Sequence, residues 1–145
     1  MIAALLMMAL DACHVLTKNE IAAVQGAPYT AAKLTTHGNT TTCFYQLPLF
    51  INSVSVDVTR TGAKEYWDQH FEHEAAGEAP EEKVSPPLEV SGVGDDALWV
   101  GSRTAGSLYV RKGDAMLRVS VGGAGTDKEK IAKSKRLAHK ALKRL

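Results

Sequence analysis

The chain has 145 residues, of which 45% are hydrophobic and 23% are charged, and its formal net charge is +1. A chain of this length typically forms one domain, and it can bury roughly 68 to 70% of the surface that its unfolded form would expose. The composition therefore excludes a generally disordered protein, and folding requires neither a metal nor a dense disulfide framework.

Opposite charges gather in two segments that the net value conceals. Residues 65–96 hold ten acids and one lysine, a balance of −9, whereas residues 127–145 hold eight bases and two acids, a balance of +6. We therefore expect any electrostatic function to lie in these two segments, because the net charge of the whole chain says nothing about it.

The first ten residues, MIAALLMMAL, are apolar and carry no charge. They are fewer than the roughly 20 residues that cross a bilayer. They resemble the hydrophobic part of a secretory signal peptide without its basic start. We therefore predict an apolar N-terminal segment at 1–10, an exported, extracytoplasmic protein and a single domain at 11–145. The alternative is an N-terminal segment that stays buried with the fold.

The two cysteines, Cys13 and Cys43, are consistent with one disulfide in an exported protein. Such a bridge would close a loop of about 30 residues and stabilise the fold by roughly 3 to 4 kcal/mol. Two alternatives remain open. Residues 10–13 partly resemble a lipoprotein processing site, and a lipid on Cys13 would exclude the disulfide. In the second alternative, neither a disulfide nor a lipid forms, and both thiols are free and buried.

In chain order, the first predicted element is a helix at residues 18–25. Thr17 and Glu20 form a T-x-x-E capping box, and Ile21 can pack back onto Leu16. Gly26 is expected to end the helix.

A Thr-rich hairpin is expected next. Residues 32–37 and 40–47 flank the turn pair Gly38-Asn39, and both have the period of two that strands show. At residues 51–59, valines at every second position predict a half-buried antiparallel strand.

Apolar residues then recur at four-residue steps, at Ala63, Trp67, Phe71 and Ala75, which predicts a second helix ending at Gly77. We expect its aromatic residues to pack the helix onto the sheet and not to stack on a ligand.

Residues 77–91 are rich in Pro, Glu and Ser and are expected to connect two parts of the same domain. Strands follow at 97–100, 108–112 and 115–121, and a Gly-Asp turn joins the last two. In these two strands the Leu and Val residues should point to one face and the arginines to the other.

A last helix begins at a second T-x-x-E box, formed by Thr126 and Glu129. Its apolar stripe comprises Ile131, Ala138, Ala141, Leu142 and Leu145. The element order αβββαβββα predicts an α+β fold, in which helices pack on one face of an antiparallel sheet of about six strands. The two halves resemble a weak internal duplication.

Four short motifs carry a resemblance to a known family. They are D-A-C-x-x-L-T-x-x-E from Asp11, C-x-Y from Cys43, V-x-G-V-G-D-x-A from Val90 and L-x-V-x-x-G-D from Leu108. Together they resemble small exported lipoprotein domains of unknown function, of the actinobacterial type with a C-x-L-L-T opening and a later G-L-G-D-x-A turn. The resemblance implies export, an α+β fold and a bridge between the two cysteines. It implies no enzymatic activity and no cofactor.

One group of residues has metal-ligand spacing. His70 and His73 lie three residues apart, so they share a helix face, and Glu74 is adjacent. The H-E-x-x-H order of zinc proteases is absent. The competing interpretation is a solvated acidic helix face without a metal.

The last helix presents the strongest basic surface. Its candidate contacts with an anionic partner are Lys133, Arg136, Lys140, Lys143 and Arg144. Lipid headgroups or an acidic wall polymer could bind there, which would give peripheral membrane association. No aromatic residues interleave with these bases, so we do not expect nucleic acid as a partner. A merely solvated face is the simpler alternative.

The sequence therefore favours a non-enzymatic, exported cell-envelope domain that binds an envelope protein or polymer. One alternative is a metal-dependent hydrolase that uses His70 and His73. Another is a structural module that docks on an anionic surface through its basic C-terminal helix. Neither the ligand nor the oligomeric state follows from the sequence.

Overall fold

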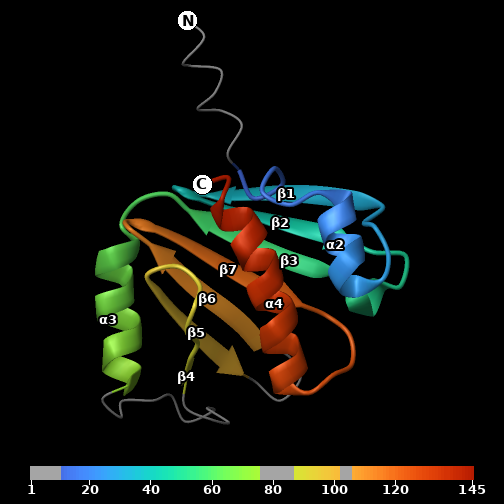
Figure 1. The fold of residues 1–145 in the computed structure, drawn as a ribbon. Coiled ribbons are helices and arrows are strands. Elements are labelled where there is room, and N and C mark those ends of the chain that lie inside the picture. The colour runs from blue at the N-terminus through green and yellow to red at the C-terminus, as the bar shows by residue number, and fades with distance from the viewer. Residues whose placement is uncertain (1–10, 76–86, 102–105) are drawn as a thin grey trace, which may run out of the picture.

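A computed structural model describes residues 11–75, 87–101 and 106–145. Three α-helices and a seven-stranded sheet make up this part of the chain (Figure 1). The helices are α2 (Lys18–Gln25), α3 (Ala63–Ala75) and α4 (Asp127–Leu142), and η1 (Phe50–Asn52) is a short 3-10 turn. The strands are β1 (Ala31–His37), β2 (Thr40–Gln46), β3 (Val54–Thr59), β4 (Leu88–Glu89), β5 (Asp96–Gly101), β6 (Gly106–Lys112) and β7 (Ala115–Val121). None of the described helices is both long and apolar enough to span a membrane.

Both predicted capping boxes are present, because they depend only on neighbouring residues. The Thr17 hydroxyl accepts a hydrogen bond from the backbone N–H of Glu20, whose carboxylate accepts the Thr17 N–H in return. Thr126 and Glu129 repeat the arrangement at the start of α4. Gly26 ends α2 in the left-handed region at φ +86°, which glycine adopts without strain.

A long-range contact caps α3 instead. The carboxylate of Asp114, in the turn between β6 and β7, accepts the backbone N–H groups of Gly62 and Lys64 at 2.9 and 3.3 Å. These hydrogen bonds lower the pKa of Asp114. Free N–H groups in the first turn of a helix need such an acceptor. The start of α3 is therefore attached to the end of the sheet.

The sheet is antiparallel throughout, in the order β1-β2-β3-β7-β6-β5-β4. The predicted α+β class and antiparallel sheet are confirmed. The observed order gains one strand, β4, which lies in the segment predicted as a connection. Two residues are too short to show a period-two pattern, so nothing in the sequence signals this strand.

The main core lies between the sheet and the helices α2 and α4 (Figure 1). Alternate residues of β3, β6 and β7 are buried there, as the expected strand faces require. From α4, Leu137, Ala138 and Ala141 are fully buried against them, whereas Ile131 and Leu145 of the predicted stripe are only partly buried.

Helix α3 packs on the opposite face, which corrects the expectation that all helices share one face. Its residue Phe71 meets the ring of Tyr109 edge-on, with centroids 5.1 Å apart. Tyr109 alternates with Leu108 and Val110, which point into the main core, so it faces the other way. Helical periodicity reveals an apolar stripe but not the sheet face that will cover it. The strands form two meanders, β1-β2-β3 and β5-β6-β7, that meet where β3 pairs with β7, and the suggested duplication of the two halves stays a prediction.

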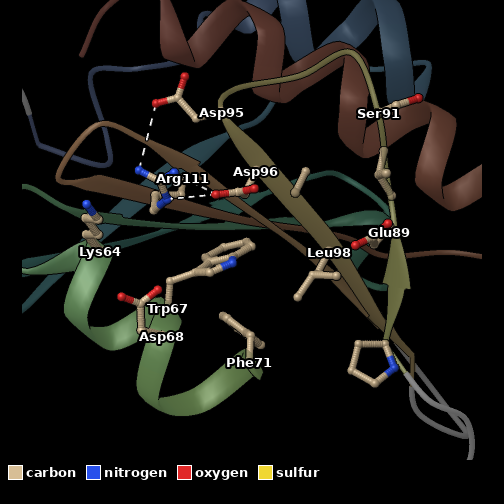
Figure 2. Close-up of a pocket in the computed structure, with 13 residues that line it drawn as sticks. Lys64, Trp67, Asp68, Phe71, Glu89, Ser91, Asp95, Asp96, Leu98 and Arg111 are labelled. Atoms are coloured by element: carbon tan, nitrogen blue, oxygen red, sulfur yellow. Dashed lines mark hydrogen bonds and ion pairs between the residues drawn. The ribbon is translucent and has the colours of Figure 1, made fainter. Parts of the chain in front are cut away.

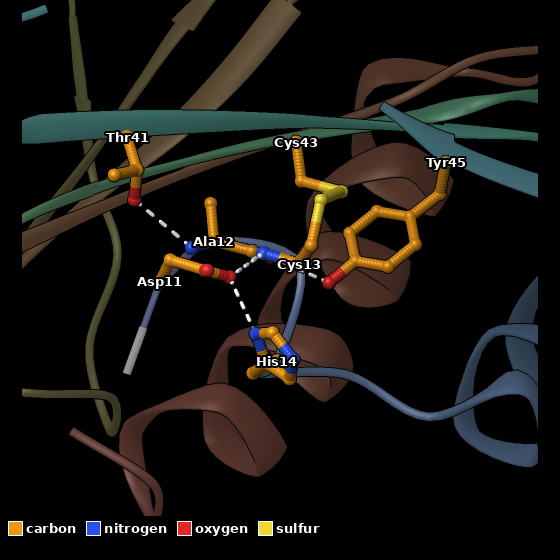
Figure 3. Close-up of a disulfide and its surroundings, with 7 residues drawn as sticks. All are labelled: Asp11, Ala12, Cys13, His14, Thr41, Cys43 and Tyr45. Carbon is orange, nitrogen blue, oxygen red and sulfur yellow. Dashed lines mark hydrogen bonds and ion pairs between the residues drawn. A yellow bond between two sulfur atoms is a disulfide. The ribbon is translucent and has the colours of Figure 1, made fainter. Parts of the chain in front are cut away.

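The disulfide between Cys13 and Cys43 ties the start of the domain to β2, with Cα atoms 5.0 Å apart (Figure 3). Around it, the Ala12 N–H donates to the Thr41 hydroxyl at 2.9 Å, and the buried Tyr45 hydroxyl donates to the Ala12 carbonyl. Burial raises the pKa of the Tyr45 phenol, so this donor keeps its proton at neutral pH. The bridge therefore holds residues 11–16 on the core.

We expect the disulfide to contribute about 3 to 4 kcal/mol to the free energy of unfolding, because it closes a loop of about 30 residues in the unfolded chain. Urea unfolding with and without a reducing agent measures this difference. A Cys13→Ala/Cys43→Ala variant is the control, because reductant should leave it unchanged. A wild-type midpoint that does not move on reduction would contradict the prediction.

Candidate functional site

A cleft of about 790 Å³ lies between α3 and the strands β4 and β5, with Arg111 of β6 at one end (Figure 2). The segment that follows β4 completes its wall. The volume falls in the range of roughly 300 to 1,000 Å³ that is typical of small-ligand pockets. The cleft is therefore the candidate binding site.

Aromatic and aliphatic side chains form the inner walls of the cleft. Trp67 and Phe71 reach from α3 toward the strands, where Leu98 stands on the facing side (Figure 2). Their four-residue spacing places both rings on one side of α3. Leu98 alternates with the core residues Ala97 and Trp99, so it points to the α3 face. Trp67 and Phe71 are only 7% and 6% exposed, so they pack the helix, as expected, while also lining the cleft.

A charged cluster closes one end of the cleft. The Arg111 guanidinium donates to Asp96 at 2.6 and 3.0 Å, and Nη1 also donates to the Gly113 carbonyl at 2.7 Å. The hydrogen bond with Asp96 raises the pKa of Arg111. Asp95 accepts the Gly113 N–H at 2.7 Å. Arg111 is thus engaged within the protein and offers little charge to a ligand.

Glycine is required at position 94 for this cluster to form. A Cβ on Gly94 would lie 2.4 Å from Val110 Cγ1 and 2.7 Å from the Arg111 carbonyl oxygen. Its φ of +61° also lies in the left-handed region. The close approach brings Asp95 and Asp96 beside Arg111.

Carboxylates outnumber cations in the cleft wall. The wall holds Asp68, Glu89, Asp95 and Asp96 against Lys64 and Arg111, a balance of −2. Figure 2 shows the Glu89 carboxylate turned toward the aromatic wall. The described lining residues include no His or Cys. This arrangement suits the binding of a group that is apolar and positively charged.

Sequence reasoning did not identify this cleft. Trp67 and Phe71 carried a signal as an aromatic pair inside the acidic segment, but their partners come from β4, β5 and β6. Only the fold brings Leu98 and Glu89 opposite them.

The structure gives the candidate metal ligand His70 a local role. Its Nδ1 lies 3.0 Å from the Tyr66 carbonyl oxygen, so Nδ1 carries the donating proton. Its ring stacks on Tyr66 with centroids 3.8 Å apart. The side chains of His73 and Glu74 lie outside the described residues, among which no group of three metal-ligating residues occurs. The metal hypothesis stays a prediction.

The basic candidates on α4 fall into two groups. Arg136, Lys140 and Lys143 are exposed and Lys133 is half-buried. Arg136 and Lys140 border a groove of about 310 Å³ between α2 and α4. Arg144 does not belong to this exposed group, because its guanidinium is bound to Glu20 and Val15 within the fold.

Arg144 joins the C-terminal end of the chain to the first helix. Its Nη1 and Nη2 donate to the two carboxylate oxygens of Glu20 at 2.8 and 3.0 Å, and Nη1 also donates to the Val15 carbonyl at 2.8 Å. Burial by itself would raise the pKa of Glu20. Hydrogen bonds from Arg144 and Thr17 outweigh that effect and lower it. Glu20 therefore closes the capping box and holds Arg144 at the same time.

Comparison with known proteins leaves the family open. No protein-family model matches the chain, and neither does any curated protein sequence. Among solved structures, it is similar to a GTP binding regulator from Thermotoga maritima, with 12% identity, a TM-score of 0.45, and coverage of 85% of this chain and 87% of the other. At this distance the likeness carries no conclusion about function.

The bidentate pair between Arg144 and Glu20 gives a pH-dependent prediction. We expect Arg144→Met to lower the free energy of unfolding by about 1 to 2 kcal/mol at pH 7. The pKa of Glu20 is lowered in the folded state, so the pair stabilises the fold above the ordinary value of 4.5 and loses its effect as pH falls below it. Urea unfolding of the wild type and of Arg144→Met at pH 7 and near pH 3 measures the loss of stability and its dependence on pH.

The neighbouring variant Lys143→Met is the matched control, because Lys143 is exposed. It should change stability little at either pH. If Arg144→Met costs the same at both pH values, the bond to the Val15 carbonyl and not the ion pair carries the effect.

Proposed function

We propose that this protein is a non-enzymatic binding module of the cell envelope and that the cleft between α3 and β4–β5 is its ligand site. One observation supports this most directly. An apolar wall of Trp67, Phe71 and Leu98 stands beside an excess of carboxylates in a cavity of about 790 Å³. Apolar surface supplies affinity in such sites, and a few charged groups supply orientation.

The proposed ligand carries an apolar or aromatic group next to a positive charge, as a basic residue in a peptide of an envelope protein does. The apolar group would contact the exposed edges of Trp67 and Phe71. The charge would lie near Glu89, on the facing wall. An anionic ligand would meet the same carboxylates and be repelled.

The disulfide supports the exported part of the proposal. Disulfides persist in oxidising compartments and are rare in the cytosol. The sulfur of Cys13 is bonded to that of Cys43, so it is not available for a lipid while the bridge stands. The proposal is therefore an exported domain without a lipid on Cys13.

The basic face of α4 supports a second candidate function. Arg136 and Lys140 are exposed beside the groove between α2 and α4, and Lys143 continues the face. This surface would dock on an anionic partner of the envelope. The acidic cleft would not share that partner, because its charge has the opposite sign.

Three small probes test the cleft, because they share a phenyl ring and differ in charge. We expect phenethylammonium to shift the backbone amide resonances of Trp67 and Leu98 at millimolar concentration, with phenylethanol weaker and phenylpropionate weakest. Glu89→Gln should weaken phenethylammonium binding about two- to fivefold.

Asp127→Asn is the control for the probe experiment, because Asp127 is exposed at the start of α4, away from the cleft. It should leave all three affinities unchanged. Equal binding of the cationic and anionic probes, or no shift with any probe, would contradict the proposed site.

Mass spectrometry of the protein recovered from its source cells tests the exported part. We expect a mature N-terminus near Asp11, no lipid, and a gain of two hydrogens on reduction of the Cys13–Cys43 bridge. An intact N-terminus with free thiols in the cytosolic fraction would overturn export and leave the cleft proposal standing.

A further inference from the structure

Three consecutive large apolar residues project from the surface at one end of the sheet. Leu49, Phe50 and Ile51 are 58%, 63% and 65% exposed, respectively, and they form the N-cap and the first two residues of the 3-10 turn η1 between β2 and β3. We call these three residues the apolar tip. Scattered exposed apolar residues are normal, whereas a contiguous set points to a contact with another surface.

Hydrogen bonds hold the apolar tip in its exposed conformation. The Asn52 and Ser53 N–H groups donate back to the carbonyls of Leu49 and Phe50 at 2.9 and 3.0 Å. From α2, the Gln25 side-chain amide donates to the carbonyls of Asn52 and Gly122 at 2.8 and 3.0 Å. The backbone of the turn is therefore fastened to α2 and to the end of β7.

Close packing beneath the apolar tip also holds the turn in place. A Cβ on Gly122 would lie 2.1 Å from the Ile51 carbonyl oxygen, so only glycine permits this approach. The Phe50 ring lies 5.5 Å from that of Phe44, centroid to centroid, and is braced from the side while staying exposed. The scaffold imposes the exposure of the tip.

The segments that hold the apolar tip contain no charged residue, although the exposed Lys33 of β1 pairs across the sheet with Phe44, which the Phe50 ring contacts. The three segments that these hydrogen bonds bring together are 25–32, 44–56 and 119–126, and none contains Asp, Glu, Lys, Arg or His. Charged residues make up 23% of the chain, so this end differs from the rest. The three side chains of the tip could enter an apolar phase without the removal of a charge from water.

We propose that the apolar tip inserts into the surface of a lipid bilayer and holds the domain there. Three residues in a projecting turn offer far less area than the roughly 800 Å² per partner of a stable protein interface. They suit insertion at a membrane, where each apolar side chain gains by leaving water. The three apolar side chains carry the insertion, so we do not expect it to require anionic lipid. This proposal is independent of the cleft.

Fluorescence of Phe50→Trp tests insertion at the tip itself. With vesicles of phosphatidylcholine, its emission should shift to the blue, and brominated phosphatidylcholine should quench it. We expect the same result with vesicles that contain anionic lipid, at low and at high salt. Ala132→Trp, at an exposed position on α4, is the control and should show neither change. Trp67 and Trp99 are buried and contribute a constant background.

A second measurement tests how much the tip contributes. Leu49→Ser/Phe50→Ser/Ile51→Ser should lower the vesicle partition coefficient at least about tenfold, because three apolar side chains are lost. Its urea midpoint should fall only slightly below that of the wild type, since these side chains are more than half exposed and the contact of Phe50 with Phe44 is the main one lost. Arg136→Glu/Lys140→Glu is the matched control and should keep its binding to phosphatidylcholine.

The outcomes separate membrane insertion from its alternatives. An unshifted and unquenched Phe50→Trp overturns the proposal, whether or not the protein binds the vesicles through another segment. Binding that needs anionic lipid and is lost in Arg136→Glu/Lys140→Glu also overturns it, in favour of the basic face of α4. Failure of the cleft probes leaves this result unaffected.

Discussion

The antiparallel pairing of β3 with β7 is the interaction on which the rest of the structure depends. It joins residues 54–59 to residues 116–121 and so unites two meanders into one sheet. On one face, the valines of β3 form the centre of the main core. On the other, Arg118 donates to both carboxylate oxygens of Asp57 at 2.7 and 3.1 Å. A pair so distant in sequence requires this support on both faces, since closing the long loop costs chain entropy.

Each surface with a candidate function follows from that sheet. Helix α3 covers the polar face near β6 and leaves a cleft against β5, whereas α2 and α4 cover the apolar face. Beside the β3–β7 pair, at the end where Val54 meets Val121, the turn with Leu49, Phe50 and Ile51 projects. The proposed ligand site and the proposed membrane contact are therefore separate surfaces on one support.

Elements that depend on neighbouring residues were predictable from the sequence. The caps at Thr17 and Thr126, the two-residue turns that begin at Gly38 and Gly113, and the alternation in β3 all agree with the structure. The disulfide agrees as well. In each case except the disulfide, the signal spans only a few residues, so local chemistry decides the outcome.

The sequence by itself determined the fold class and the boundaries of most elements, and it favoured the disulfide between Cys13 and Cys43 that the structure shows. Only the tertiary structure decided that α3 lies on the face opposite α4 and begins at a cap from Asp114. It also decided that Arg144 binds Glu20, and that Glu89 and Leu98 face Trp67. These partners are brought together by strand order and helix placement. Which side chains meet when they lie far apart in the sequence depends on how all the helices and strands pack, and a local sequence pattern does not contain that information.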